Sequence, residues 1–140
     1  MPEIARFNGK KVLFRGDHDK VFTDEELAPY FDEILPEGEG KVIEIDGMKC
    51  WVNHYPTEGK PDMFNLVGHV HAAWKFQLNM LNVGLDVHHF RPILITDVPD
   101  HFTAITKYYD RDVWVAYEDV IQKFSGERGL KTRYFKKDEK

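Results

Sequence analysis

Three short polar segments constrain this chain more than any other feature of its sequence. They read Gly16-Asp17-His18-Asp19, Asn53-His54-Tyr55-Pro56 and Gly68-His69-Val70-His71. Each places histidine or carboxylate beside glycine or proline, and each follows a run rich in apolar, β-forming residues. Strands end and loops begin at such positions, and loops held by a rigid scaffold carry most catalytic and binding residues. We therefore expect the chemistry of this chain to lie in these three loops.

The turn and capping signals between the segments predict a succession of strands. Thr23, with Glu26 three residues later, forms a capping box that predicts a helix over about residues 24–31. Asp46-Gly47 lies between two alternating apolar runs and predicts a hairpin with a type I′ turn. The expected strands lie within residues 10–15, 42–45, 48–52, 63–67, 76–83 and 93–95. One early helix among many strands fits half of a two-sheet α/β sandwich rather than a complete doubly wound fold.

Length, charge and cysteine content set the class of protein. A chain of 140 residues predicts one domain. The net charge of −5 argues against a general nucleic-acid coat protein and leaves nucleic acid only as a possible partner. No apolar run reaches the roughly 18 residues that indicate a transmembrane helix, so no membrane partner is expected. The single cysteine, Cys50, excludes an intramolecular disulfide framework, and a cytoplasmic location follows as an expectation.

The last part of the chain differs in character from the rest. Residues 113–115 form a short β-like run, and residues 117–124 have helical periodicity. Many of the chain's aromatic residues lie in its last 40 positions, and aromatic side chains bury large areas. We therefore expect residues 99–140 to be a C-terminal extension that packs on the domain of residues 1–98 or on a partner.

In their order along the chain and in their residue types, the three segments resemble the motifs of the calcineurin-like metallophosphoesterases, which read GNHD, a later single histidine and GHxH. The run from Leu81 to Asp86, followed by Phe90-Arg91-Pro92, is similar to a small bacterial and phage branch of that family. The resemblance covers about residues 8–92. It implies an α/β fold, a truncated metallophosphoesterase-like two-sheet sandwich with an added C-terminal α+β segment.

The resemblance also implies roles for the residues at the matching positions. His18 would contact the phosphate and assist the leaving group, with Asp19 supporting it. His71 would ligate a first metal ion. The ligands of a second metal ion would be Asp17, His54 and His69. The implied cofactor is a divalent metal, Mn²⁺, Zn²⁺ or Fe²⁺, because histidine with carboxylate is a usual ligand set for these ions.

Two further motifs of that family, DxH and GDxxD, have no counterpart before Gly16. We therefore expect a domain that lacks the family's first βαβ unit and holds one metal ion per chain. Asp17 stands where the family has asparagine, and its extra negative charge would partly replace the lost carboxylate. The strand before Gly16 would become a sheet edge, and unpaired edges invite another chain. A homo-oligomer, or a protein partner that completes the fold, follows as an expectation.

Two functions remain open at this point. One is a metal-dependent phosphoesterase that hydrolyses a phosphomonoester or a phosphodiester by metal-activated water. Its site, which has fewer ligands than the family's, would hold one metal ion or would be completed by another chain. The other is an inactive relic that acts as a binding or assembly protein, for example of a phage. In that alternative the histidines are neutral, hydrogen-bonded polar groups, and His18 is a solvated loop residue.

Overall fold

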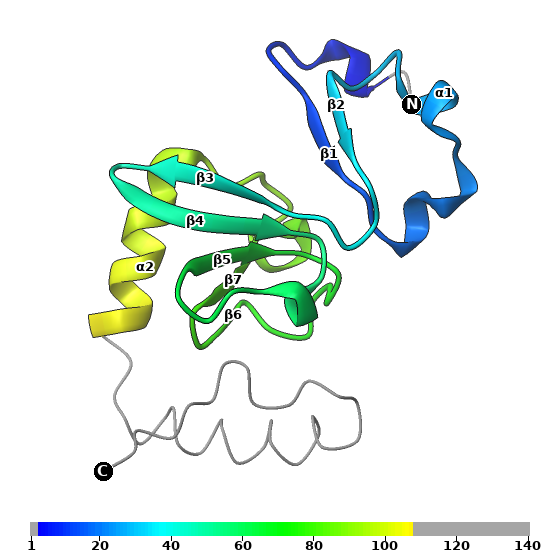
Figure 1. The fold of residues 1–140 in the computed structure, drawn as a ribbon. Coiled ribbons are helices and arrows are strands. Elements are labelled where there is room, and N and C mark those ends of the chain that lie inside the picture. Colours follow the sequence, from blue (N-terminus) through cyan, green and yellow to red (C-terminus); the bar gives the residue numbers. More distant parts are fainter. Residues whose placement is uncertain (1–2, 108–140) are drawn as a thin grey trace.

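The computed structural model describes residues 3–107 and has a mixed α/β fold with two sheets (Figure 1). The α-helices within this range are α1 (Asp24–Leu27) and α2 (Val98–Lys107). The strands are β1 (Val12–Phe14), β2 (Glu33–Leu35), β3 (Lys41–Ile45), β4 (Met48–Asn53), β5 (Phe64–Val67), β6 (Phe76–Gln77) and β7 (Met80–Asn82). No helix within the described range has the length and apolar character that crossing a bilayer would require.

The larger sheet has the order β3-β4-β5-β7-β6, and its three central strands run parallel. Cys50 of β4 pairs with Phe64 of β5, and Asn65 of β5 pairs with Met80 of β7. The outer strands β3 and β6 run antiparallel to their neighbours. Because parallel strands end at the same edge, the loops that follow β4, β5 and β7 meet there.

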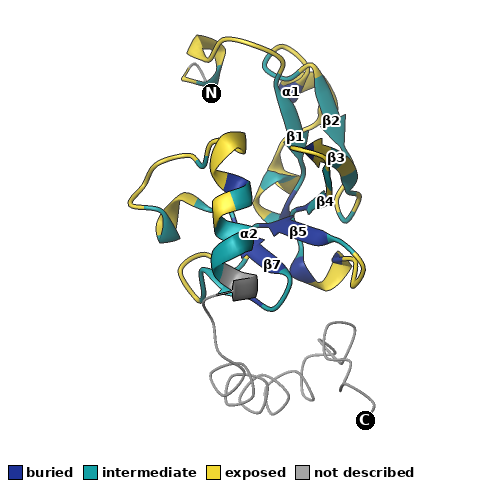
Figure 2. Cartoon of the chain, turned by 90° about the vertical axis from the view of Figure 1, so that its left-hand side faces the viewer, coloured by how far each residue is buried: buried dark blue, intermediate teal, exposed yellow. Residues whose placement is uncertain are grey.

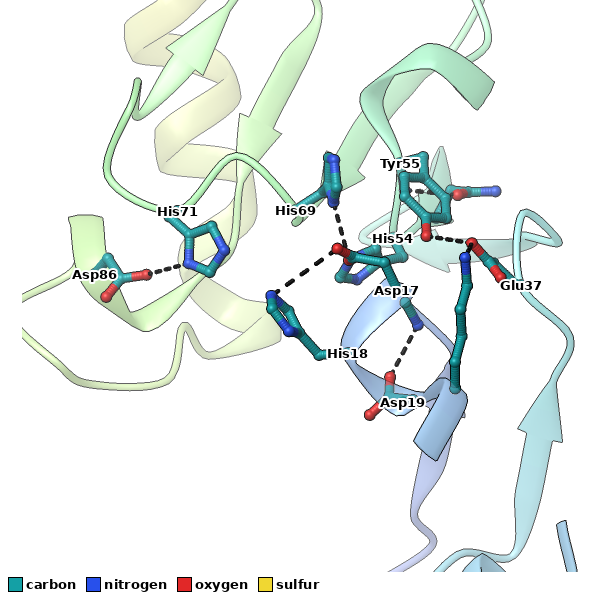
Figure 3. Close-up of polar contacts among 12 residues, drawn as sticks. Asp17, His18, Asp19, Glu37, His54, Tyr55, His69, His71 and Asp86 are labelled. Atoms are coloured by element: carbon teal, nitrogen blue, oxygen red, sulfur yellow. Dashed lines mark hydrogen bonds and ion pairs between the residues drawn. The ribbon is translucent and has the colours of Figure 1, made fainter. Parts of the chain in front are cut away.

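The smaller sheet is the parallel pair β1-β2, which stands apart from the larger sheet (Figure 1). Among the described residues, β2 is the sole strand partner of β1. All six side chains of this pair are half-buried. The segment that leaves β1 continues into Gly16 and Asp17 and so reaches the edge where the loops of the larger sheet meet (Figure 3).

The hydrophobic core lies between the larger sheet and α2. Its buried members are Ile45, Cys50, Phe64, Leu66, Leu81 and Val98. Figure 2 shows that the buried residues concentrate in β5 and β7. Cys50 of β4 and Val98 at the start of α2 are buried as well. Phe102 of α2 packs edge-on against Phe64 of β5, with 5.2 Å between the ring centroids. The expected boundary between residues 98 and 99 therefore falls in the first turn of a helix that contributes to this core.

Several expected elements are present. β1 ends before Gly16, and the Thr23 hydroxyl accepts a hydrogen bond from the Glu26 backbone N–H in the expected capping box. Asp46 and Gly47 both have positive φ, at 53° and 79°, as a type I′ turn requires. Helix α1 is shorter than the expected 24–31 and ends at Leu27. The expected β-like run and helix over residues 113–124 lie outside the described residues.

Two expected elements differ from the structure. Residues 76–83 hold a hairpin of two strands, because the chain turns at Leu78, with φ 53°, and at Asn79. The Asn79 side chain stabilises this turn by donating to the carbonyl oxygens of Lys60 and Met63 at 3.0 and 2.8 Å. The strand expected at residues 93–95 is absent. The Asp97 carboxylate instead caps a 3₁₀ turn at the Leu94 N–H, and Pro99 sits in the first turn of α2, where its missing N–H costs nothing.

Candidate metal centre

The three polar segments meet at the edge where β4, β5 and β7 end (Figure 3). Asp17 begins the 3₁₀ helix Asp17–Val21, His54 follows β4, and His69 follows β5. One ligand atom from each of these three residues lies within 4.8 Å of the other two. The Asp17 Oδ1 atom is 3.2 Å from His69 Nδ1 and 3.5 Å from His54 Nε2. Residues far apart in the sequence thus supply one carboxylate and two imidazoles to a single point.

Gly16 allows this approach because it has no side chain. A Cβ atom at this position would collide with the His54 imidazole. Gly16 is buried and has extended backbone, at φ −113° and ψ −176°, which any residue can adopt. Contact with His54, rather than backbone freedom, therefore explains the glycine before Asp17.

His54 carries the clearest sign of a missing partner. Its Nε2 atom is buried and has no hydrogen-bond partner among the described residues. Burial lowers the pKa of this imidazole, and the neighbouring His69 lowers it further, against an opposing effect of Asp17. Histidine binds a metal ion as a neutral imidazole, through a ring nitrogen that carries no proton. The His54 Nε2 atom, which lies 3.5 Å from Asp17 Oδ1, is suited to this role.

The Asp17 carboxyl is held in its charged form. Partial burial alone would raise its pKa, but a hydrogen bond from its own backbone and the nearby His18 and His69 lower the pKa overall. An ionised carboxylate is the ligand form for a divalent cation. The residues present therefore fit one divalent ion with three protein ligands, an arrangement that catalytic zinc sites use.

The segment after β5 holds two histidines in left-handed backbone. His69 has φ 67° and His71 has φ 48°, values that non-glycine residues rarely adopt. The Gly68 N–H donates to the His54 carbonyl at 3.0 Å, and the buried Asn82 side chain donates to the His71 carbonyl at 2.7 Å. These bonds fix a strained turn that presents His69 toward Asp17, and such strain is common at functional sites.

His71 lies apart from the three-residue group. Its Nδ1 atom is 3.6 Å from Asp86 Oδ2, and its ring faces that of His18 at 5.9 Å (Figure 3). His18 is 78% exposed, and its Nε2 atom lies 3.9 Å from Asp17 Oδ2. The structure thus brings together Asp17, His54 and His69 of the expected ligands and places His18 next to Asp17. His71, the expected ligand of a first metal ion, lies outside this group and next to Asp86.

The Asp19 side chain bonds to the backbone of its own loop, and within residues 3–107 it makes no hydrogen bond to His18. Its carboxylate accepts the Gly16 backbone N–H at 2.8 Å, and its own N–H donates to the Gly16 carbonyl. Arg15 adds to this, donating to the Asp19 carbonyl at 3.2 Å. Asp19 therefore shapes the turn that carries Asp17.

Sequence reasoning missed other residues that shape the site. Asn53 is buried at the end of β4, donates to the Gly38 carbonyl at 2.9 Å and accepts the Tyr55 N–H at 2.8 Å. Asn82 is equally buried at the end of β7. An asparagine at the end of each of two apolar strand runs was the available signal, because buried amides need partners and nearby loops supply them.

Comparison with known proteins places the fold but names no family. No protein-family profile matches the chain, and no curated protein matches it. A crystal structure of the protein of unknown function AQ665 from Aquifex aeolicus is similar, with a TM-score of 0.51 and 22% sequence identity. The match covers 70% of this chain and 64% of that protein, so this chain corresponds to less than two thirds of its length. The likeness shows a shared fold.

The contact between Gly16 and His54 leads to a prediction. Gly16→Ala should displace the His54 imidazole and lower stability by about 1–3 kcal/mol, as overpacking does. Gly68→Ala is the matched control, because a Cβ there would lie 3.6 Å from His54 Nδ1, an ordinary contact. Thermal unfolding and the imidazole NMR signals of both variants provide the measurement. Equal behaviour of the two variants would contradict the role assigned to Gly16.

Proposed function

We propose that this chain is a metal-dependent phosphoesterase-like hydrolase with a site for one divalent cation. The observation that carries the proposal is the convergence of Asp17, His54 and His69 from three separate loops, with a buried His54 Nε2 atom that makes no hydrogen bond within residues 3–107. Carboxylate with imidazole suits Zn²⁺, Mn²⁺ and Fe²⁺. The order of the motifs in the sequence, which resembles the calcineurin-like metallophosphoesterases, supports the same reading and a related sandwich fold.

The residues around the ion position suit a phosphate ester. A bound divalent cation would supply Lewis acidity toward a phosphoryl oxygen. Asp17, His54 and His69 would hold and orient that cation. His18 is exposed beside Asp17 and free to contact a substrate, so its imidazole can donate a hydrogen bond to the phosphate.

The proposal also gives His18 a role toward the departing group. As water attacks phosphorus, the new P–O bond forms and the ester P–O bond breaks. In this role the His18 imidazole would give a proton to the departing oxygen, and the attacking water would release a proton to solvent. General acid catalysis of this kind contributes about 10²–10⁴-fold to a rate. Substrates of either class, phosphomonoester or phosphodiester, fit this arrangement.

Hydrolysis of p-nitrophenyl phosphate and bis-p-nitrophenyl phosphate in the presence of Mn²⁺ or Zn²⁺ tests the proposal. We expect activity that EDTA abolishes and that His54→Gln removes together with metal binding. His18→Ala should lower kcat by about 10²-fold or more while metal affinity is kept. His101→Gln, on α2, is the matched histidine control. Activity that survives EDTA, or that falls equally in His101→Gln, would contradict the proposal.

A second candidate function, as a binding or assembly protein, is favoured by the small sheet. Parallel sheets are normally covered on both faces, yet the β1-β2 pair is only half-buried. Val21 and Phe7, on segments that flank this sheet, are 76% and 64% exposed. Exposed apolar surface of this kind commonly marks an interface.

Pairing of two copies through β1 predicts a dimer in solution. Leu13→Glu on β1 should shift the chain toward monomer, whereas Val42→Glu on the exposed edge strand β3 should not. Light scattering coupled to size-exclusion chromatography measures the mass over a range of concentrations. A monomer at every concentration, or an equal effect of both substitutions, would remove this candidate.

A further inference from the structure

We propose that Tyr55, held by Glu37, is the positioning residue that orients both His54 and His69 toward Asp17. The inference rests on the proposed metal site, and it concerns how that site is built before any ion binds. Tyr55 follows His54 directly at the end of β4 and lies beside the three ligand residues (Figure 3).

The phenol ring contacts both imidazoles. Its centroid lies 4.8 Å from that of His54, with the rings at 85°, and 4.7 Å from that of His69, with the rings at 59°. The two imidazoles lie 5.4 Å from each other. Terminal torsions of aromatic side chains are broad and soft, so an unsupported imidazole rotates readily. One ring that touches both histidines restricts both rotations together.

Tyr55 is held through its backbone and through its hydroxyl group. Its backbone N–H donates to Asn53 Oδ1 at 2.8 Å, and its hydroxyl donates to Glu37 Oε1 at 2.6 Å. The short distance between the Tyr55 hydroxyl and the Glu37 carboxylate is typical of a charge-assisted hydrogen bond.

This tether joins the parts of the chain that supply the ligands. Lys20 lies in the same 3₁₀ helix as Asp17, and its Nζ atom is 2.9 Å from Glu37 Oε1. Glu37 lies between β2 and β3, where the chain passes from the small sheet to the large one. The bonds among these residues thus connect the Asp17 side of the site to the two histidines. Lys20 is exposed and pairs at the surface, so it contributes least.

A structural role in the core does not account for these contacts. Tyr55 is only partly buried and lies outside the hydrophobic core formed by the large sheet and α2. Its removal should therefore disturb the imidazoles more than the overall stability. Residues that orient metal ligands typically change metal affinity by 10–100-fold when they are replaced.

The experiment uses the full chain with Tyr55→Phe, Tyr55→Leu and Glu37→Gln, and with Tyr30→Phe and Tyr30→Leu as matched controls. Tyr30 is also partly buried, and it lies after α1. Long-range ¹H–¹⁵N NMR of the imidazoles in EDTA reports ring orientation without metal, and titration with Zn²⁺ reports affinity. Melting temperature in EDTA reports stability.

We expect Tyr55→Leu to move the imidazole signals of both His54 and His69. Tyr55→Phe, which keeps the ring, should bind Zn²⁺ about 10-fold more weakly at an unchanged melting temperature. Glu37→Gln keeps an acceptor oxygen and should retain most of the affinity. The Tyr30 variants should match the wild type in all three measurements.

Unchanged imidazole signals in Tyr55→Leu, or wild-type Zn²⁺ affinity in both Tyr55 variants, would overturn the inference. Because Tyr55→Phe removes only the hydroxyl, it remains informative even if the leucine variant is less stable. Failure of the wild type to bind Zn²⁺ would contradict the proposed function instead. The metal-free spectra would then still decide whether Tyr55 orients the two histidines.

Discussion

The His54 imidazole packs against the backbone of Gly16, where any side chain would collide with it. Through this contact the end of β1 meets the end of β4, and the small sheet reaches the edge of the large one. Asp17 follows Gly16 directly, so the same contact sets its distance to His54 and His69. Geometry at one glycine thus determines whether three ligand atoms lie within reach of one ion.

The large sheet supplies the rest of the site through its topology. Its three central strands run parallel, so the loops after β4, β5 and β7 emerge together. Two buried asparagines, Asn53 and Asn82, then bind the carbonyl groups of neighbouring segments and fix the loops. Helix α2 packs against the core of this sheet through Val98 and Phe102. A rigid scaffold with shaped loops is a common basis for binding and catalysis.

Local signals in the sequence predicted part of this fold and site. The capping box at Thr23 and the Asp46-Gly47 turn are correct because their chemistry is contained within a few residues. The turn at Leu78 was missed because a leucine with positive φ depends on bonds made by Asn79 to a distant loop. For the same reason, sequence motifs indicated ligand residues but not the support from Tyr55 and Glu37, which only the folded chain brings together.

Zinc binding to the purified chain tests the central claim most directly. Equilibrium dialysis followed by elemental analysis gives both stoichiometry and affinity, and Asp17→Asn is the informative variant because it removes only the charge. The account predicts one zinc ion per chain in the wild type and clearly weaker binding in Asp17→Asn. Absence of bound zinc in the wild type, or equal affinity in the variant, would contradict a metal site built from Asp17, His54 and His69.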